Sequence, residues 1–312
     1  MFSHFLRTLF CSALLVTFCA AQQPAPAVPP APGSAADLLQ RASKLSREGK
    51  QDDALSIYTG ILSKSPDSYE AHIGAGIALD LKGNYSVARE HFTRALDVAP
   101  ADSRQEALRE LAFSYVFEGN AFKAAEAETQ VFNARLAKND SVGAAETCNE
   151  LARIYLESGD ADHAYKWYKM GYYTVSNKPD LSDADKNLWL FRWESAQARV
   201  AARRGAAAEA AQHVLAAKAA LDRANNPDQA RFYPYLTGYV AFYSGDYKTA
   251  VAEFQKADQH DPFILVMLGQ AYEKSGNAAL ARESYRKVLE INFHNPTNAF
   301  ARPIARSKLA GG

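Results

Sequence analysis

The chain has 312 residues, of which 48% are hydrophobic and 22% are charged, so it contains enough apolar side chains to bury a sizeable core. It carries 35 basic and 35 acidic residues, and this balance gives no net field to attract nucleic acid or an acidic membrane surface. Cys11 and Cys19 lie in the first 21 residues, which leaves Cys148 without an internal disulfide partner, so the fold must depend on packing.

The first 21 residues are typical of a secretory signal. Arg7 makes a positive start, residues 8–20 are apolar, and small residues precede a cleavage point before Gln22. The apolar run is short for a bilayer span, so we expect an exported protein, periplasmic or extracellular and associated with the cell envelope, with no stable transmembrane span after cleavage. The alternatives are retention as an anchor and, more weakly, lipid attachment at Cys19. Phe18 disfavours attachment, because lipoprotein signals have a small residue there.

A linker rich in proline and alanine follows, from residue 22 to residue 33. Its five prolines predict an extended, semi-rigid spacer between the signal and the folded part. Ser34 and Asp37 then form a capping pattern, which predicts that the first helix begins here.

The dominant pattern is a glycine followed five residues later by an alanine, and it occurs seven times. The pairs are Gly49/Ala54, Gly83/Ala88, Gly119/Ala124, Gly159/Ala164, Gly205/Ala210, Gly245/Ala250 and Gly276/Ala281. Glycine tolerates the left-handed conformation that ends a helix, and the small alanine lets the next helix pack closely. Four residues beyond the alanine stands an aromatic residue in five copies, whereas the third copy has Glu128 and the fifth has Val214. The pattern predicts seven helix-turn-helix units.

These residues resemble the tetratricopeptide repeat family. The first two alanines are 34 residues apart, which equals the period of that family. Further support comes from closing prolines and from a small residue at the corresponding place of every first helix. The prolines are Pro66, Pro100 and Pro262, and the small residues are Ala42, Gly76, Ala112, Ala152, Ala198, Gly238 and Gly269. The resemblance implies an all-α fold, a right-handed superhelical solenoid of about seven repeats, over residues 34–293.

Two breaks divide the predicted array, one after residue 176 and one at residues 225–228, between the fifth and sixth units. Repeats 1–4 occupy residues 34–176, and the loop up to Ser182 is a candidate hinge. Ser182 and Asp185 can cap a long helix that runs to about Arg203, at the start of repeats 5–7 in residues 183–293. The polar segment 294–312 is expected to be a short solvating cap or tail.

The sequence contains no motif that indicates catalysis. Metal-ligand spacing, a nucleophile elbow, a phosphate-binding loop and paired cysteines are missing, and the seven histidines are scattered singly. We therefore predict no enzyme activity, no cofactor and no metal site. Cys148 is interpreted as a buried, inert thiol rather than as an intermolecular bridge.

Stacked repeats generate a concave surface lined by the first helix of each unit, which makes that surface the candidate partner-binding site. We select its aromatic and arginine residues because such residues dominate interface hot spots. They are Arg109, Phe113 and Phe117 from the third unit, Arg153 from the fourth, Arg192, Arg199 and Arg203 from the fifth, and Phe232, Tyr235, Tyr239, Phe242 and Tyr243 from the sixth.

The same aromatic and arginine residues can also be explained by a purely structural role. Aromatic residues at helical spacing are more often core than site. Arg192, Arg199 and Arg203 can pair with the carboxylates of the neighbouring first helix, which are Glu146, Glu150 and Glu157, and such pairs contribute little to stability.

The sequence therefore favours an exported, non-enzymatic adaptor or scaffold that binds a protein or an extended peptide in its concave groove. The family's clamp for chaperone tails is not expected, because Leu39, Ser43, Ile73 and Ile77 stand where its lysine and asparagine would be. The alternative is a glycan or peptidoglycan binder of the cell envelope, since sugars stack on flat rings. Its candidate residues are Trp167, Trp189 and Trp193.

Overall fold

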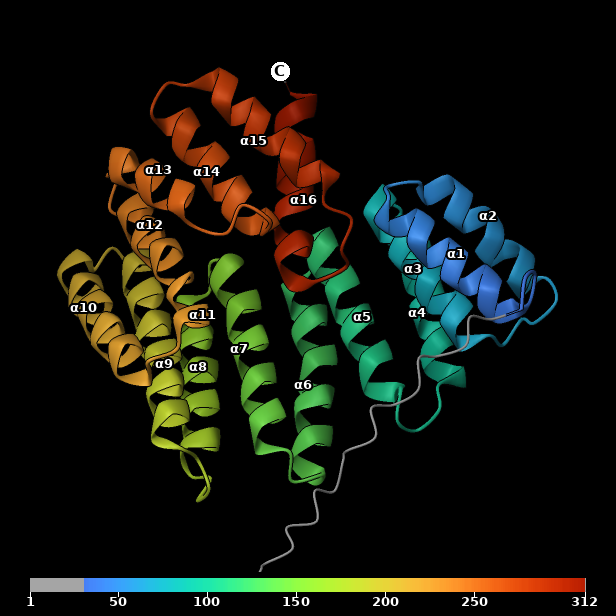
Figure 1. Cartoon of the computed structure of the whole chain (residues 1–312), viewed down its shortest axis with the longest axis horizontal. Coiled ribbons are helices and arrows are strands. Elements are labelled where there is room, and N and C mark those ends of the chain that lie inside the picture. The colour runs from blue at the N-terminus through green and yellow to red at the C-terminus, as the bar shows by residue number, and fades with distance from the viewer. Residues whose placement is uncertain (1–30, 312) are drawn as a thin grey trace, which may run out of the picture.

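The computed structural model describes residues 31–311, and every regular element in this range is an α-helix. The predicted signal and residues 22–30 of the predicted linker lie outside the described residues. The helices form seven helix-turn-helix hairpins, one for each predicted unit (Figure 1). The hairpins are α1 (Ala35–Arg47) with α2 (Gln51–Leu62), α3 (Tyr69–Lys82) with α4 (Tyr85–Val98), α5 (Arg104–Glu118) with α6 (Ala121–Ala137), α7 (Ser141–Glu157) with α8 (Ala161–Ser176), α9 (Asp183–Arg203) with α10 (Ala207–Ala224), α12 (Tyr233–Tyr243) with α13 (Tyr247–Lys256), and α14 (Pro262–Lys274) with α15 (Ala278–Glu290). The predicted all-α repeat solenoid is confirmed.

Each hairpin turns at a glycine in the left-handed conformation. All seven predicted turn glycines have φ between +75° and +100°. At Gly83 the backbone closes the helix end: Gly83 donates its N–H to the carbonyl of Asp80, and Asn84 donates to Leu79, each at 2.9 Å. These bonds satisfy carbonyl groups that the end of α3 would otherwise leave unpaired.

Small residues let the two helices of a hairpin approach closely. The seven repeat alanines are at most 1% exposed. At Gly76 on α3, an added Cβ would lie 2.6 Å from the ring of Phe92 on α4, which is closer than atoms can pack. The glycine therefore makes room for the aromatic residue of the second helix.

Predicted helix starts are confirmed at two serines, and one proline has a different role. Ser34 and Ser182 each accept a hydrogen bond on the side-chain oxygen, from the N–H of Asp37 at 3.2 Å and of Asp185 at 3.1 Å. Pro262 does not close a helix. It is the first residue of α14, where its missing N–H leaves no hydrogen bond unmade.

The apolar core continues across the loop after α8. One cluster joins Ala152 and Tyr168 from the first predicted sub-array with Val200, Tyr239 and Phe254 from the second. Between α10 and α12 the chain makes one short helix, α11 (Pro227–Ala230). Packing is thus continuous from the fourth repeat to the end of the array.

The two repeats that lack the aromatic residue of the second helix differ in what occupies its place. In the fifth, α9 and α10 are long and rich in alanine, and Val214 is only half-buried. In the third, Glu128 is fully buried and neither carboxylate oxygen has a hydrogen-bond partner. Burial raises the pKa of Glu128 well above its usual value, and the nearby carboxylate of Glu150 raises it further.

The segment after residue 293 is not a solvating tail. Residues Pro296–Ala310 form α16, which packs against α14, α15 and the distant α5 (Figure 1). Arg302, only 7% exposed, donates hydrogen bonds to the carbonyl of Leu81 at 3.1 Å and to that of Ile291 at 2.9 Å. Arg306 also donates to Leu81. The C-terminal helix therefore ties the end of the array to its second repeat.

His294 anchors this segment in the same place. Its side chain is 2% exposed, and its two ring nitrogens bond Glu110 and, at 2.9 Å, Asp80. The ring also packs on Phe92 and Phe117, with centroid separations of 5.6 and 5.1 Å. Burial alone lowers the pKa of His294, but the two carboxylates outweigh it and raise the pKa to about 9. The buried imidazole is therefore positively charged at pH 7.

Candidate functional site

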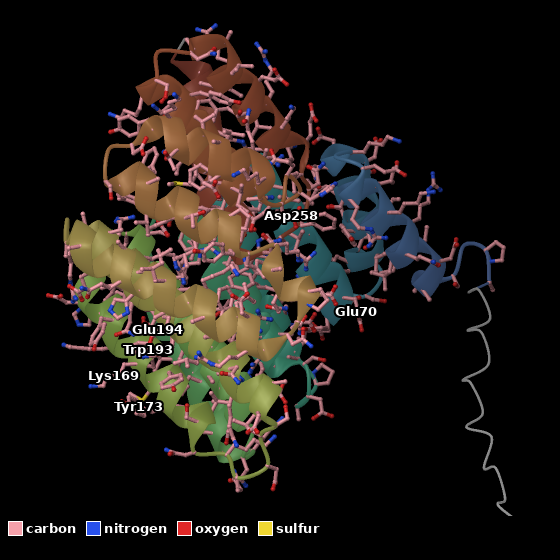
Figure 2. All side chains as sticks on the ribbon, turned by 60° about the vertical axis from the view of Figure 1, so that its left-hand side comes forward. Glu70, Lys169, Tyr173, Trp193, Glu194 and Asp258 are labelled. Carbon is pink, nitrogen blue, oxygen red and sulfur yellow. The ribbon has the colours of Figure 1, made fainter. Side chains whose placement is uncertain are left out.

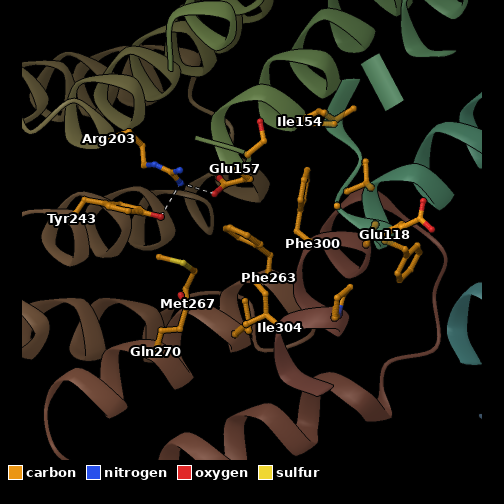
Figure 3. Close-up of a pocket in the computed structure, with 18 residues that line it drawn as sticks. Glu118, Ile154, Glu157, Arg203, Tyr243, Phe263, Met267, Gln270, Phe300 and Ile304 are labelled. Atoms are coloured by element: carbon orange, nitrogen blue, oxygen red, sulfur yellow. Dashed lines mark hydrogen bonds and ion pairs between the residues drawn. The ribbon is translucent and has the colours of Figure 1, made fainter. Parts of the chain in front are cut away.

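Two pockets are lined mainly by residues of the first helices of the repeats and of α16. One, of about 400 Å³, lies near the glycine turns, and we call it the turn pocket (Figure 3). It is lined by Val116, Phe117, Glu118, Gly119, Ala121, Ile154, Glu157, Ser158, Arg203, Tyr243, Phe263, Val266, Met267, Gln270, Ala299, Phe300, Pro303 and Ile304. The other, of about 380 Å³, is formed further back along the first helices, and we call it the arginine pocket. It is lined by Asn149, Glu150, Arg153, Tyr168, Phe191, Arg192, Ser195, Arg199, Gln229, Phe232, Tyr235, Leu236, Pro296 and Thr297.

A stack of one arginine and three rings stands between the two pockets. The guanidinium of Arg153 lies 4.5 Å from the ring centre of Phe263 and 5.9 Å from those of Tyr235 and Phe300. Arg153 and Tyr235 line the arginine pocket, whereas Phe263 and Phe300 line the turn pocket. This cation–π cluster is therefore the wall that the pockets share.

The turn pocket contains a buried ion pair. Arg203 donates to the carboxylate of Glu157 at 3.1 Å and to the hydroxyl of Tyr243 at 2.8 Å (Figure 3). Tyr239 donates to the other oxygen of Glu157 at 3.3 Å. Burial raises the pKa of Glu157, and nearby arginines, Arg153 first, oppose the rise. Glu157, Arg203, Tyr239 and Tyr243 therefore satisfy one another.

The structure brings eight of the twelve sequence-predicted residues to the pockets. The arginine pocket is lined by Arg153, Arg192, Arg199, Phe232 and Tyr235. The turn pocket is lined by Phe117, Arg203 and Tyr243. Residues from three successive first helices, α7, α9 and α12, therefore meet in one place, as the repeat pattern predicts.

The other four residues line neither pocket. Tyr239 is 0% exposed and Phe113 is 3% exposed, so both are core residues and not contact residues. Phe242 packs edge-on against Tyr243 and Tyr247, with centroid separations of 5.2 and 5.6 Å. Arg109 binds Glu150 through two hydrogen bonds of 2.6 and 3.2 Å.

The C-terminal segment contributes to the burial of the third unit's aromatic residues. His294 lies 6.1 Å from Phe113 and 5.1 Å from Phe117, between ring centres. Although Phe117 borders the turn pocket, it is only 2% exposed. His294 of the C-terminal segment therefore packs on both rings.

One of the three proposed arginine pairs forms. Arg203 pairs with Glu157, but Glu150 pairs with Arg109, and Glu146 lies 3.9 Å from Arg135. Within residues 31–311, neither Arg192 nor Arg199 has a carboxylate within ion-pair distance. Instead, Arg192 lies 4.6 Å from the ring centre of Trp189 and Arg199 lies 5.2 Å from that of Tyr168.

Sequence reasoning missed several lining residues. Tyr168 was expected only as the aromatic of a second helix, yet it also reaches the arginine pocket. The one available signal was its hydroxyl, because a buried tyrosine needs a hydrogen-bond partner that phenylalanine does not. Phe263 and Phe300 come from α14 and α16, and no local pattern indicates that these helices meet α7.

The three tryptophans pack within the fold. Trp193 stacks on Tyr172 with 5.6 Å between ring centres, and Figure 2 shows it beside Lys169 and Tyr173 on the α8–α9 side of the molecule. Trp189 is 5% exposed, and Trp167 contacts Phe132 edge-on. Trp167 and Trp193 are half-buried against these rings, and none of the three tryptophans lines either pocket.

Three further features bear on the earlier expectations. Cys148 is 0% exposed, and burial raises the pKa of its thiol to about 12, which agrees with an inert thiol. In the described part of the chain, no three or more His, Cys, Asp or Glu side chains are grouped so as to hold a metal ion. None of the described helices has the length and apolar character needed to cross a membrane.

Comparisons with known proteins agree with the fold. Models of the tetratricopeptide repeat match residues 45–112 and residues 145–169 and 264–295. The apo form of RapI is similar in structure, with a TM-score of 0.56 and 14% identity over 88% of this chain and 98% of that one. A tetratricopeptide repeat protein from Parabacteroides merdae gives a TM-score of 0.50 with 14% identity over 88% and 98% of the two chains.

A further match is confined to one segment. Over 98 residues the chain is 34% identical to the probable UDP-N-acetylglucosamine–peptide N-acetylglucosaminyltransferase SPINDLY of Solanum lycopersicum. The match covers 31% of this chain and only 10% of the transferase, so it gives no reason to assign transferase activity here. Seven hairpins with glycine turns, the matched repeat models and the similar solved folds lead to one conclusion: the chain belongs to the tetratricopeptide repeat family.

Proposed function

We propose that this protein is an exported, non-enzymatic scaffold that holds a protein or an extended peptide in its concave groove. Tetratricopeptide repeats indicate a protein-interaction scaffold. The observation that favours the groove as the site is the meeting of aromatic and arginine side chains from three successive first helices in the arginine pocket.

The location of the binding surface can be tested at two phenylalanines. Phe232 borders the arginine pocket and is 38% exposed, whereas Phe122 on the second helix α6 is 73% exposed and borders neither pocket. A photoreactive phenylalanine at each position, followed by crosslinking in the native cell, identifies the neighbours of each surface. The captured partner is then purified and its affinity is measured directly.

We expect Phe232→Ala to weaken binding of that partner by about tenfold or more, as loss of a central contact does. Phe122→Ala should leave the affinity unchanged. The opposite ranking would overturn the groove as the site, because non-specific adhesion follows exposure and so favours Phe122. Equal circular dichroism of the two variants is the control for folding.

Export rests on the sequence of the first 21 residues. Mass spectrometry of the protein isolated from its own cell should give an amino terminus at Gln22, in the envelope or extracellular fraction. An intact first segment would contradict cleavage, and recovery with the cytoplasmic fraction would contradict export.

A further inference from the structure

Polar atoms without hydrogen-bond partners concentrate in the arginine pocket. Nine buried side-chain nitrogen or oxygen atoms in the described part of the chain lack a partner, and four belong to residues that line this pocket. They are Arg153 Nε and the hydroxyl oxygens of Tyr168, Ser195 and Tyr235. The Tyr168 hydroxyl lies close to the Arg199 guanidinium, so the other three are the atoms that need a further partner. Native proteins rarely leave buried polar atoms unpaired, so these three indicate a ligand.

The same pocket has positive charge to which no carboxylate is bound. Within residues 31–311, none of its three arginines, Arg153, Arg192 and Arg199, has an ion-pair partner within 4 Å. Arg199 is partly engaged, because its Nε donates to the carbonyl of Ser195 at 3.3 Å. The charge that remains for a ligand is therefore mainly that of Arg153 and Arg192.

The carboxylates on the lining and near Arg153 are bound to other groups. Glu150 is the one carboxylate that lines the pocket, and Arg109 holds it through two hydrogen bonds. Glu157 influences Arg153, but its oxygens accept from Arg203 at 3.1 Å and from Tyr239 at 3.3 Å.

Two further carboxylates are also engaged elsewhere. Asp261, which influences Arg153, accepts from the N–H of Phe263 at the start of α14. Glu146, which influences Arg192, lies 3.9 Å from Arg135. An anionic ligand is therefore the remaining source of negative charge for the pocket.

The three unpartnered atoms can all act as donors. An arginine Nε carries a hydrogen, and a serine hydroxyl can donate its own. Burial raises the pKa of Tyr235 to about 12, so its hydroxyl also keeps its proton at pH 7. On α9, Arg192, Ser195 and Arg199 share one face because of their helical spacing. Donors from α7, α9 and α12 thus line one space.

The number of donors and the charge favour a phosphoryl group. A carboxylate offers two oxygens and one negative charge. A phosphate monoester offers three strong acceptor oxygens and a charge of about −1.5 to −2 at pH 7. Two guanidinium groups and three further donors therefore match the phosphate monoester better.

The rest of the lining is apolar and larger than a bare phosphate ion needs. Phe191, Phe232 and Leu236 contribute to it, and the volume of about 380 Å³ falls within the range of small-molecule sites, about 300–1,000 Å³. The cation–π cluster around Arg153 separates this space from the turn pocket. The space therefore suits a compact ligand with an apolar part.

We propose that the arginine pocket binds a small organic phosphate monoester whose ester group is aromatic or aliphatic. The phosphoryl group is bound by Arg153, Arg192 and the hydroxyls of Ser195 and Tyr235, and the ester group packs on Phe191, Phe232 and Leu236. This ligand goes beyond the scaffold role, because it gives the groove a small-molecule site.

The test compares three probes by titration calorimetry with the full-length protein at pH 7.5. Phenyl phosphate has both the phosphoryl group and a ring, benzoate has a ring and a carboxylate, and inorganic phosphate has no ring. Phenyl phosphate should bind at least about tenfold more tightly than either of the others. Equal binding of benzoate or of inorganic phosphate would overturn the proposal, and so would failure of phenyl phosphate to bind.

Tyr235→Phe separates a ligand-binding role from a structural one. The hydroxyl has no partner in the free protein, so its removal should leave the melting temperature unchanged or raised. Affinity for phenyl phosphate should nevertheless fall by about tenfold. Tyr285→Phe on α15 is the matched control: this hydroxyl is also buried without a partner, but Tyr285 does not line the pocket. Equal losses of affinity in the two variants would overturn the site.

Arg192→Gln tests the charge. It should weaken phenyl phosphate by about tenfold or more, as loss of a charge-assisted hydrogen bond does. Arg223→Gln on α10, where the guanidinium donates to Asn187 at 3.1 Å, is its control and should leave the affinity unchanged. Thermal melts check that each variant folds. The same loss in the control would place the phosphate elsewhere on the surface and overturn the pocket as the site.

Further outcomes separate this ligand from a protein partner. A pentapeptide with a central phosphotyrosine that binds more tightly than phenyl phosphate would assign the pocket to a modified protein and overturn the small-molecule ligand. If phenyl phosphate binds as expected and crosslinking at Phe232 captures no partner, the scaffold role fails and the phosphate site stands. A captured partner without binding of phenyl phosphate would overturn the phosphate site and leave the scaffold role intact.

Discussion

At the residue scale, Gly76 shows how tightly the helices of one hairpin meet. Gly76→Ala should destabilise the protein by about 1–3 kcal/mol, because the new methyl group would lie 2.6 Å from the ring of Phe92. Urea unfolding followed by circular dichroism measures the change in the free energy of unfolding.

The same substitution at Gly60 is the matched control. Gly60 lies in α2, with no atom within 4 Å of the place where a Cβ would stand. Alanine is the better helix former, so Gly60→Ala should stabilise the protein by up to about 1 kcal/mol. Equal effects of the two substitutions would mean that space at Gly76 does not limit packing.

At the element scale, α6 departs from the repeat pattern at one position. Glu128 fills the place where most repeats have an aromatic ring, and its carboxyl is buried without a partner. Glu128→Leu should stabilise the protein by about 1–3 kcal/mol at pH 7, since a group of similar size replaces an unsatisfied polar one. Glu126→Leu on the exposed face of α6 is the control and should change stability by less than about 0.5 kcal/mol.

The sign of the pH effect provides a second check on Glu128. The pKa of Glu128 in the folded protein lies above its ordinary value of 4.5. As the pH rises through 4.5 the carboxyl therefore ionises first in the unfolded chain, which increasingly destabilises the folded state relative to it. The gain from Glu128→Leu should therefore be larger at pH 7 than at pH 4. A gain independent of pH would show that desolvation of the charge is not the cause.

Hairpins could be predicted from the sequence because their determinants are local. A turn glycine such as Gly83 and a buried alanine such as Ala88 are separated by five residues, and each acts on its immediate neighbours. The position of α16 could not be predicted. Arg302 hydrogen-bonds Leu81, which is 221 residues away, and nothing in the polar sequence around it indicates that partner.

The candidate site could also be predicted only where its determinants are local. Arg192 and Arg199 project from one face of one helix, so their spacing places them together in the pocket. Tyr239 and Phe113 follow the same spacing, but the network around Glu157 and the insertion of His294 bury them. The spacing of residues along a helix identifies which of them share a face. Contacts with segments that are distant in the sequence determine whether that face is exposed.

At the scale of the whole molecule, the charge of His294 helps hold the end of the array against its beginning. The folded pKa is about 9 and the ordinary value is 6.5, so the stabilisation from this charge is fully present below pH 6.5 and is lost as the pH rises through 9. A shift of this size corresponds to on the order of 3 kcal/mol.

His294→Gln removes the titrating group and keeps a hydrogen-bond donor. The difference in free energy of unfolding between the natural protein and this variant should be largest at pH 6 and should shrink by pH 10. Guanidinium unfolding at a series of pH values measures it. A constant difference would mean that the neutral imidazole contributes as much as the charged one.

The same long-range contacts have a consequence for how the chain reaches its native state. In an open array each repeat touches only its neighbours, so structure can spread along it as it is synthesised. Here His294 and Arg302 bind residues 214 and 221 positions earlier, which raises the contact order. Folding should therefore finish with a slow docking step. Until the ribosome has made the last helix, the apolar sides of α5 and α14 are open to chaperones.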